Sequence, residues 1–272
     1  MKKLLLPLLI LAMISCCALG ETLYCATEDA VFAADFSDEI AVTDTRLDAL
    51  DALTDGSAAL LTQQELIEAL QGYSEVDVTT DIRLIRPLGQ GALYVVCSAE
   101  TAGDMRTLSD LVSYIDENEY ALSIMRCFEA SVEDYASMVL MDTLPLDSEM
   151  FVDAQDKEDC LRDGAYILVV DEVSAVVLNN EGCVVLGALT NERTGAFPSL
   201  PCAGECGLPA VRGTLYAIYA PAGAEESAYS DAEFSPDTLE ELYLTAPDDD
   251  ISLEEEISRY VDYMTAEGLF FY

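Results

Sequence analysis

The chain has 272 residues, of which 51% are apolar, and this is enough for one large domain or for two lobes with real cores. Its 12 basic and 52 acidic side chains give a net charge of -40, which disfavours nucleic acid and anionic membranes as partners. The chain contains no histidine, which excludes Ser-His-Asp and Cys-His catalysis as well as histidine-ligated zinc.

Residues 1–20 have the layout of a secretory signal. Lys2 and Lys3 precede an apolar run that is too short to cross a membrane, and small residues follow it. Two processing routes fit this layout, namely cleavage after Gly20 or lipid attachment at Cys16. We therefore expect an exported protein, periplasmic or at the cell surface, that is either soluble or held by one lipid.

From residue 21 onward, short apolar runs typical of strands alternate with helical patterns. The expected strands span residues 22–26, 57–61, 92–97, 120–124, 165–170, 183–189 and 214–220. Capping boxes open helices at Thr62 and Ser252, and apolar stripes typical of helices begin at Leu108 and Val132. The alternation predicts an α/β protein with mostly parallel sheets and helices on both faces. Residues 141–164 and 190–212 are interpreted as joints and loops, which favours two lobes over one.

Export makes the cysteines candidates for disulfides. Nine cysteines less Cys16 and Cys17 leave seven after cleavage, so at least one is free or bonded between molecules. Cys202 and Cys206 are the best pair, because Gly204 between them lets the backbone fold back, but free thiols fit equally well. The acidic run 248–250 favours a helix start over a calcium site, because it lacks the spacing of a calcium-binding loop, and we expect no metal.

An ordered series of turn and loop residues occupies positions 182–224. The strand GCVVLGALT is followed by ERT, FPSLP, a single glycine, GT and finally APAG. This order resembles the substrate-binding proteins of tripartite tricarboxylate transporters, the TctC or Bug family. In that family a strand, an Arg-Ser or Arg-Thr turn, a proline loop and a strand ending in Ala-Pro-x-Gly follow one another. Weaker likenesses extend the resemblance over most of residues 50–270.

The resemblance implies a two-lobe, periplasmic-binding-protein-like (type II) fold in which the chain crosses to the second lobe and returns. Lobe 1 would comprise residues 21–98 and 213–272, and lobe 2 would comprise residues 99–212. The resemblance also implies a monomeric solute-binding protein that is not an enzyme and carries no cofactor. Such a protein closes its lobes on a small molecule, with a carboxylate as one candidate, and delivers it to the membrane subunits of a transporter.

The candidate ligand contacts each follow a strand, because open α/β sheets bind ligands at the carboxyl ends of their strands. They are Thr27, Thr62, Gln63, Arg126, Ser131, Asp171 and Ser174. Arg126 fits two roles: it pairs with a ligand carboxylate, or it balances nearby acids such as Glu129.

The loops at 25–39 and 125–131 lack the glycines that such binding proteins use to bring backbone amides close to a ligand. This departure leaves a second hypothesis open, in which the chain keeps the scaffold but acts as a cell-surface interaction or sensory module.

Overall fold

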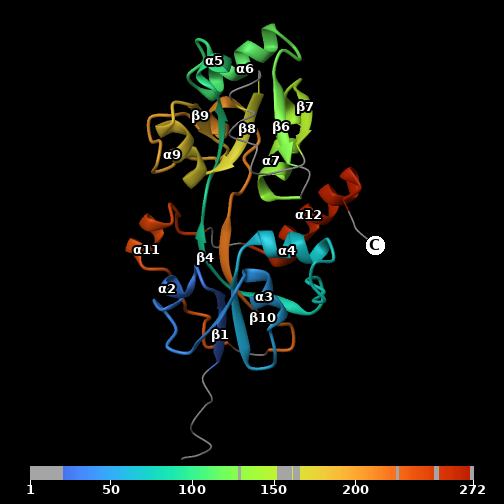
Figure 1. Cartoon of the computed structure of the whole chain (residues 1–272), viewed down its shortest axis with the longest axis vertical. Coiled ribbons are helices and arrows are strands. Elements are labelled where there is room, and N and C mark those ends of the chain that lie inside the picture. The colour runs from blue at the N-terminus through green and yellow to red at the C-terminus, as the bar shows by residue number, and fades with distance from the viewer. Residues whose placement is uncertain are drawn as a thin grey trace, which may run out of the picture.

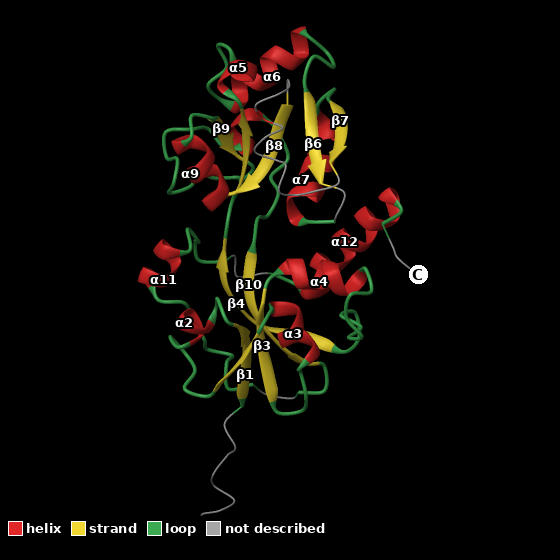
Figure 2. Cartoon of the chain, viewed as in Figure 1, coloured by secondary structure: helices red, strands yellow, loops and turns green. Residues whose placement is uncertain are grey.

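The computed structural model describes residues 21–127, 130–151, 161, 166–224, 227–247 and 251–269. The expectations for the signal segment, for Cys16 and for the acidic run 248–250 therefore fall outside the described residues. Two sheet-centred lobes lie end to end along the long axis of the molecule, and each sheet carries helices (Figure 1, Figure 2). Within the described ranges, no helix combines the length and the apolar character needed to cross a membrane.

Lobe 1 is built on a sheet of five strands in the order β2-β1-β3-β10-β4. Their bounds are β1 (Thr22–Ala26), β2 (Ile40–Thr43), β3 (Ser57–Leu61), β4 (Ile82–Gln90) and β10 (Leu215–Pro221). One face packs against α3 (Arg46–Asp51) and α4 (Gln63–Leu70), and the other packs against α2 (Ala30–Ala33) and α11 (Pro236–Glu241). Every residue of β3 is buried, because apolar side chains on both of its faces are covered.

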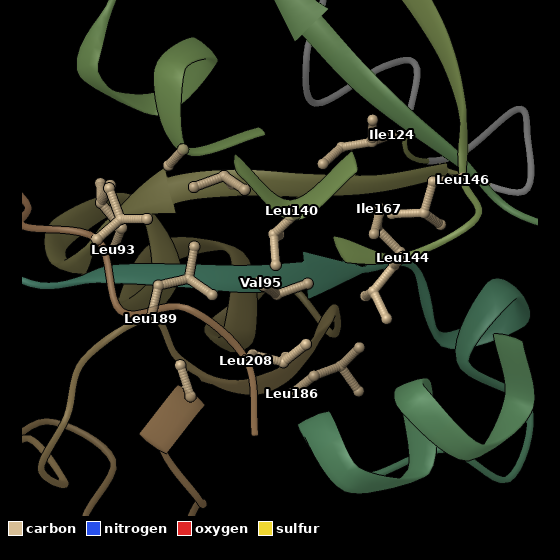
Figure 3. Packing of buried hydrophobic residues seen from close by; sticks show 14 of the residues in the cluster. Leu93, Val95, Ile124, Leu140, Leu144, Leu146, Ile167, Leu186, Leu189 and Leu208 are labelled. Atoms are coloured by element: carbon tan, nitrogen blue, oxygen red, sulfur yellow. The ribbon is translucent and has the colours of Figure 1, made fainter. Parts of the chain in front are cut away.

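Lobe 2 repeats this plan with the strand order β7-β6-β8-β5-β9. Its strands are β5 (Leu93–Cys97), β6 (Ser123–Cys127), β7 (Asp147–Phe151), β8 (Tyr166–Asp171) and β9 (Val184–Ala188). The helices α6 (Leu108–Glu117) and α7 (Val132–Thr143) cover one face, and α9 (Glu172–Asn180) covers the other. Figure 3 shows the first of these interfaces, where Val95, Ile167 and Leu140 meet in the core.

Four of the five strands in each sheet run in the same direction, which confirms the mostly parallel α/β architecture. The reversed strand is β10 in lobe 1 and β5 in lobe 2, and each pairs antiparallel with both of its neighbours. These are the strands on which the chain arrives from the other lobe. The direction of arrival therefore explains the one reversal in each sheet.

Several predicted bounds need correction. Strand β5 belongs to the sheet of lobe 2, so the first crossing lies at Gly91 and Ala92 rather than at residue 98. The reason is that an unbroken apolar run such as 92–97 fits the centre of either sheet. The sixth strand begins at Ser123, three residues later than the predicted start at 120. Strands β2, β4 and β7 were not predicted, and β7 lies inside a segment interpreted as a joint.

The two segments that cross between the lobes touch each other at Gly91 and Gly213. The backbone N–H of Gly91 donates to the carbonyl of Thr214 at 2.6 Å. The buried side chain of Gln63 pins the return crossing to the start of α4, because its Nε2 donates to the carbonyl of Gly213 at 2.5 Å and its Oε1 accepts from Leu215 N–H. A Cβ atom at position 213 would lie 2.6 Å from the Gly91 oxygen, so the crossing requires glycine there.

A third link between the lobes is α12 (Leu253–Glu267), which begins at the predicted cap Ser252 and ends at Gly268 in the left-handed conformation. Ile257 and Val261 pack on the core of lobe 1, whereas Tyr260, Tyr263 and Met264 join the core of lobe 2. Figure 1 shows α12 at the level where the lobes meet, beside α4.

We expect Gly213→Ala to lower the free energy of unfolding by about 1–3 kcal/mol, because the new Cβ must push the two crossings apart. The matched control is Gly195→Ala, since a Cβ at Gly195 meets no atom within 4 Å. Urea unfolding of both variants gives the comparison. Equal stability of the two variants would show that the contact at Gly91 is not close-packed.

Candidate functional site

A pocket of about 780 Å³ lies beside the crossings and takes its lining from both lobes. Lobe 1 contributes Gln90 and Thr245, and lobe 2 contributes Tyr135 of α7, Glu172 of α9 and the loop that follows β9. Arg259 of α12 completes the wall. The pocket has a size typical of small-molecule sites, and its position between the lobes means that an occupant would touch both.

Three of the chain's nine arginines line this pocket, namely Arg193, Arg212 and Arg259. Arg259 Nη1 lies 3.0 Å from Glu256 Oε1, and Arg212 Nη1 forms an ion pair with the same oxygen. Glu256 is buried, and the two guanidinium groups share its Oε1 atom. The guanidinium of Arg259 is 43% exposed and therefore accessible from the pocket.

Two arginines outside the described pocket are bound by acidic side chains. Arg46 binds Asp29 through two hydrogen bonds of 2.7 and 2.9 Å and lies 2.9 Å from Glu28. Arg126 binds Asp134 at 2.8 and 3.0 Å and Glu267 at 3.0 Å. Each of these two arginines thus faces two carboxylates.

Glu172 lines the same pocket next to the N-cap residue Asp171. Burial raises its pKa to about 7, hydrogen bonds from Tyr94 and from the Ala196 backbone oppose this rise, and the charge of Asp171 adds to it. The Tyr94 hydroxyl also hydrogen-bonds to Thr194, which is part of the pocket lining. Glu172 therefore keeps its proton to a higher pH than an exposed glutamate does.

The predicted contacts of lobe 1 use their polar groups within the protein. Thr27 is exposed, and its hydroxyl donates to the Thr43 carbonyl at 3.0 Å. Thr62 is buried and forms the predicted capping box with Glu65 at the start of α4. Gln63 is fully buried and holds the return crossing, as described above. The described lining of the pocket contains none of these three residues.

The loop that contains Thr27 is closed by the buried Asp29. Its ion pair with Arg46 fills the carboxyl end of β1, and the guanidinium also stacks 5.3 Å from the ring centre of Tyr216. Burial disfavours the charged form of Arg46, but the hydrogen bonds to Asp29 outweigh this effect. The pKa of Arg46 is therefore raised above its ordinary value. A side-chain ion pair thus occupies the place where glycine-rich loops present backbone amides.

In lobe 2, two of the predicted contacts cap helices. Ser131 accepts a hydrogen bond from Asp134 N–H at 3.1 Å, and Asp171 accepts one from Ser174 N–H at 2.7 Å. The start of α4 touches lobe 2, because Gln64 Nε2 donates to the Ala130 carbonyl at 3.3 Å.

Arg126 is buried, with 5% of its surface exposed, and it does not line the described pocket. Its partners Asp134 and Glu267 come from α7 and α12, whereas the expected partner Glu129 lies outside the described residues. Burial opposes the charge of the guanidinium, but these hydrogen bonds raise its pKa. A ligand contact at Arg126 stays a prediction.

The expected disulfide between Cys202 and Cys206 is not formed in the structure, where both residues are free cysteines. They flank the single turn α10 (Ala203–Cys206), so their side chains reach different partners. The thiol of Cys202 donates to the Asn191 carbonyl at 3.2 Å, and the sulfur of Cys206 lies 3.2 Å from the Ser109 hydroxyl. The described residues also contain no cluster of acidic or cysteine side chains able to hold a metal ion.

Sequence reasoning missed Glu172, Arg212 and Arg259, and it quoted Arg193 only as part of a turn. One signal was available, because arginine is scarce in a chain with 52 acidic residues. Applied to every arginine, it would have included the three that line the pocket.

Solved structures with the same fold are solute-binding proteins. MatC from Rhodopseudomonas palustris, solved with bound malate, is 17% identical, and the match covers 89% of this chain and 98% of MatC with a TM-score of 0.60. A second R. palustris protein, solved with adipate, is 14% identical over 91% of this chain and 97% of its own, also with a TM-score of 0.60. A TctC solute binding protein from Polaromonas is 12% identical over 91% and 96%, with a TM-score of 0.62.

No protein-family model matches the chain, and no curated protein matches it in sequence. At identities this low the structural likeness shows the fold. It confirms the two-lobe, periplasmic-binding-protein-like α/β architecture to which the sequence resemblance pointed.

The raised pKa of Glu172 makes the stability of the protein depend on pH. The folded chain binds this proton more tightly than the unfolded chain, whose pKa is near 4.5, so stability falls as the pH rises from about 4.5 to about 7. We expect Glu172→Gln to be more stable than the parent by about 1–3 kcal/mol at pH 8 and equally stable at pH 4. Urea unfolding at both pH values measures this difference.

The control for this experiment is Glu181→Gln, which removes an exposed carboxylate near the other end of α9. It should leave the stability unchanged at both pH values. A Glu172→Gln variant whose stability parallels that of the parent from pH 4 to pH 8 would show that Glu172 titrates normally.

Proposed function

We propose that the protein is an extracytoplasmic solute-binding protein that captures a small carboxylate between its lobes. The observation that carries this proposal is the pocket of about 780 Å³ with walls from both lobes and three arginines in its lining. The fold is shared with proteins solved with malate and with adipate, which supports a carboxylate as the ligand class. Delivery to membrane subunits of a transporter, a monomeric state and the absence of enzymatic activity are parts of the same proposal.

Arg212 and Arg259 are the residues that we propose to contact the ligand carboxylate. Guanidinium groups bind carboxylates through paired N–H donors, and both of these arginines line the pocket. Buried Glu256 fixes both arginines in place before a ligand arrives, which reduces the entropy lost on binding. In this proposal, arginine side chains donate the hydrogen bonds to the ligand carboxylate, in place of backbone amides from glycine-rich loops.

The polar residues at the strand ends complete the proposal as secondary contacts. Thr27 and Ser174 are partly or fully exposed, so their side chains remain accessible at the boundary. Thr62, Gln63, Ser131 and Asp171 would act by holding the helix starts and the return crossing in place.

A second candidate function is a cell-surface interaction or sensory module without the usual ligand. The observation that favours it is the Asp29–Arg46 pair, which fills the end of β1 with side chains. The two functions differ in whether a small carboxylate stabilises the folded chain.

We expect a thermal-shift titration with malate or adipate to give a saturable rise in melting temperature of roughly 5–10 °C at about 100 times the dissociation constant. Arg259→Gln should weaken the binding by about tenfold or more, because it removes a charged donor from the pocket. The matched control is Arg106→Gln, since Arg106 is exposed and does not line the pocket. No shift with any member of a panel of di- and tricarboxylates, amino acids and cations would favour the second function.

A further inference from the structure

The C-terminal half of α12 makes polar contacts with a receiving site that lobe 2 builds on its own. The receiving site is the ion pair between Arg126 of β6 and Asp134 of α7, which lies entirely within lobe 2. From α12, the hydroxyl of Tyr263 donates to Asp134 Oδ2, and Glu267 Oε2 lies 3.0 Å from Arg126 Nη2. We call Arg126, Asp134, Tyr263 and Glu267 the α12 latch.

The α12 latch is mostly buried, and this strengthens its hydrogen bonds. Asp134 is 2% exposed and Tyr263 is 6% exposed, so water competes little for these hydrogen bonds. If α12 moved away, Arg126 and Asp134 would keep their two mutual hydrogen bonds, because both belong to lobe 2. Among the polar contacts of the α12 latch, opening would therefore break only the two arms from α12, and it would leave neither Arg126 nor Asp134 unpaired.

Apolar contacts follow the same path across the lobe boundary. The ring of Tyr135 on α7 meets Tyr260 and Tyr263 edge to face, with ring centres 5.7 and 5.6 Å apart. Ile67 of α4 lies in the same core cluster as the residues of lobe 2. At its other end, α12 is anchored on lobe 1 through Ile257 and Val261.

We propose that the α12 latch holds the two lobes together through protein contacts alone, so that the closed arrangement does not depend on a ligand. The same helix places Arg259 in the pocket wall and brings Tyr263 and Glu267 onto lobe 2. Because α12 contributes to both places, a movement of the two lobes relative to each other would also move the pocket wall. A latch that favours the closed state raises the fraction of molecules that are competent to bind, and so it raises the apparent affinity for a ligand. This statement about affinity rests on the proposed function.

The test compares the parent chain with the double variant Tyr263→Phe/Glu267→Gln, which removes both polar arms and keeps the aromatic ring. Small-angle X-ray scattering of each protein is recorded without ligand and with malate. We expect the parent to have the same radius of gyration in both conditions. The double variant should be larger without malate, return to the parent value with malate, and bind malate about tenfold more weakly.

The matched control is Tyr73→Phe/Glu75→Gln, which makes the same chemical changes at exposed positions of lobe 1. Cooperative urea unfolding of all three proteins shows whether each one folds. If the double variant fails to fold, the single variant Glu267→Gln is measured in the same way. It changes only the arm from Glu267, which is less buried than the arm from Tyr263.

Two results would overturn the latch. One is a parent chain that is as large as the variant without ligand, and the other is a variant as compact as the parent. If no carboxylate binds to the parent, the proposed function fails, but the scattering of the ligand-free proteins still decides whether the latch exists.

Discussion

The contact between Gly91 and Gly213 is the constraint on which the region between the lobes depends. The two crossings can run this close because Gly213 carries no side chain, since a Cβ there would lie 2.6 Å from the Gly91 oxygen. The hydrogen bond from Gly91 to Thr214 joins the two crossings. The neighbours of these glycines, Gln90, Ala92 and Arg212, consequently line the pocket. The pocket lies at the crossing end of the sheets because the chain must pass there twice.

The sequence predicted the central strands well and missed three edge strands, and the reason is physical. A central strand covered on both faces needs an unbroken apolar run, and β3, with every residue buried, is such a run. An edge strand has one free side and tolerates charge and proline. Strand β4 contains two arginines and Pro87, so its nine residues carry no strand pattern, and β2 and β7 are likewise at sheet edges.

None of the seven predicted contacts lines the described pocket, so the sequence did not identify the residues of the candidate site. The rule that ligands bind at strand ends placed Thr62, Ser131 and Asp171 at the lobe boundary. Each of them caps a helix in the structure, because caps and ligand contacts use the same residue types at the same positions. The pairing of Arg126 with Glu267 joins residues far apart in the chain, so no local pattern could reveal it.

The charge of the chain decides which arginines are available to an anion. The buried carboxylates Asp29, Asp134 and Glu256 each have a guanidinium partner, because an unpaired buried charge is costly. Arg46 and Arg126 each meet this need while facing two acids, so neither has positive charge to spare. Glu256 instead binds two arginines, Arg212 and Arg259, and both of these line the pocket. In a chain of net charge -40, an anion gains most from an arginine that it can reach. Arg259 at the pocket beside the crossings is 43% exposed, whereas Arg126 is buried.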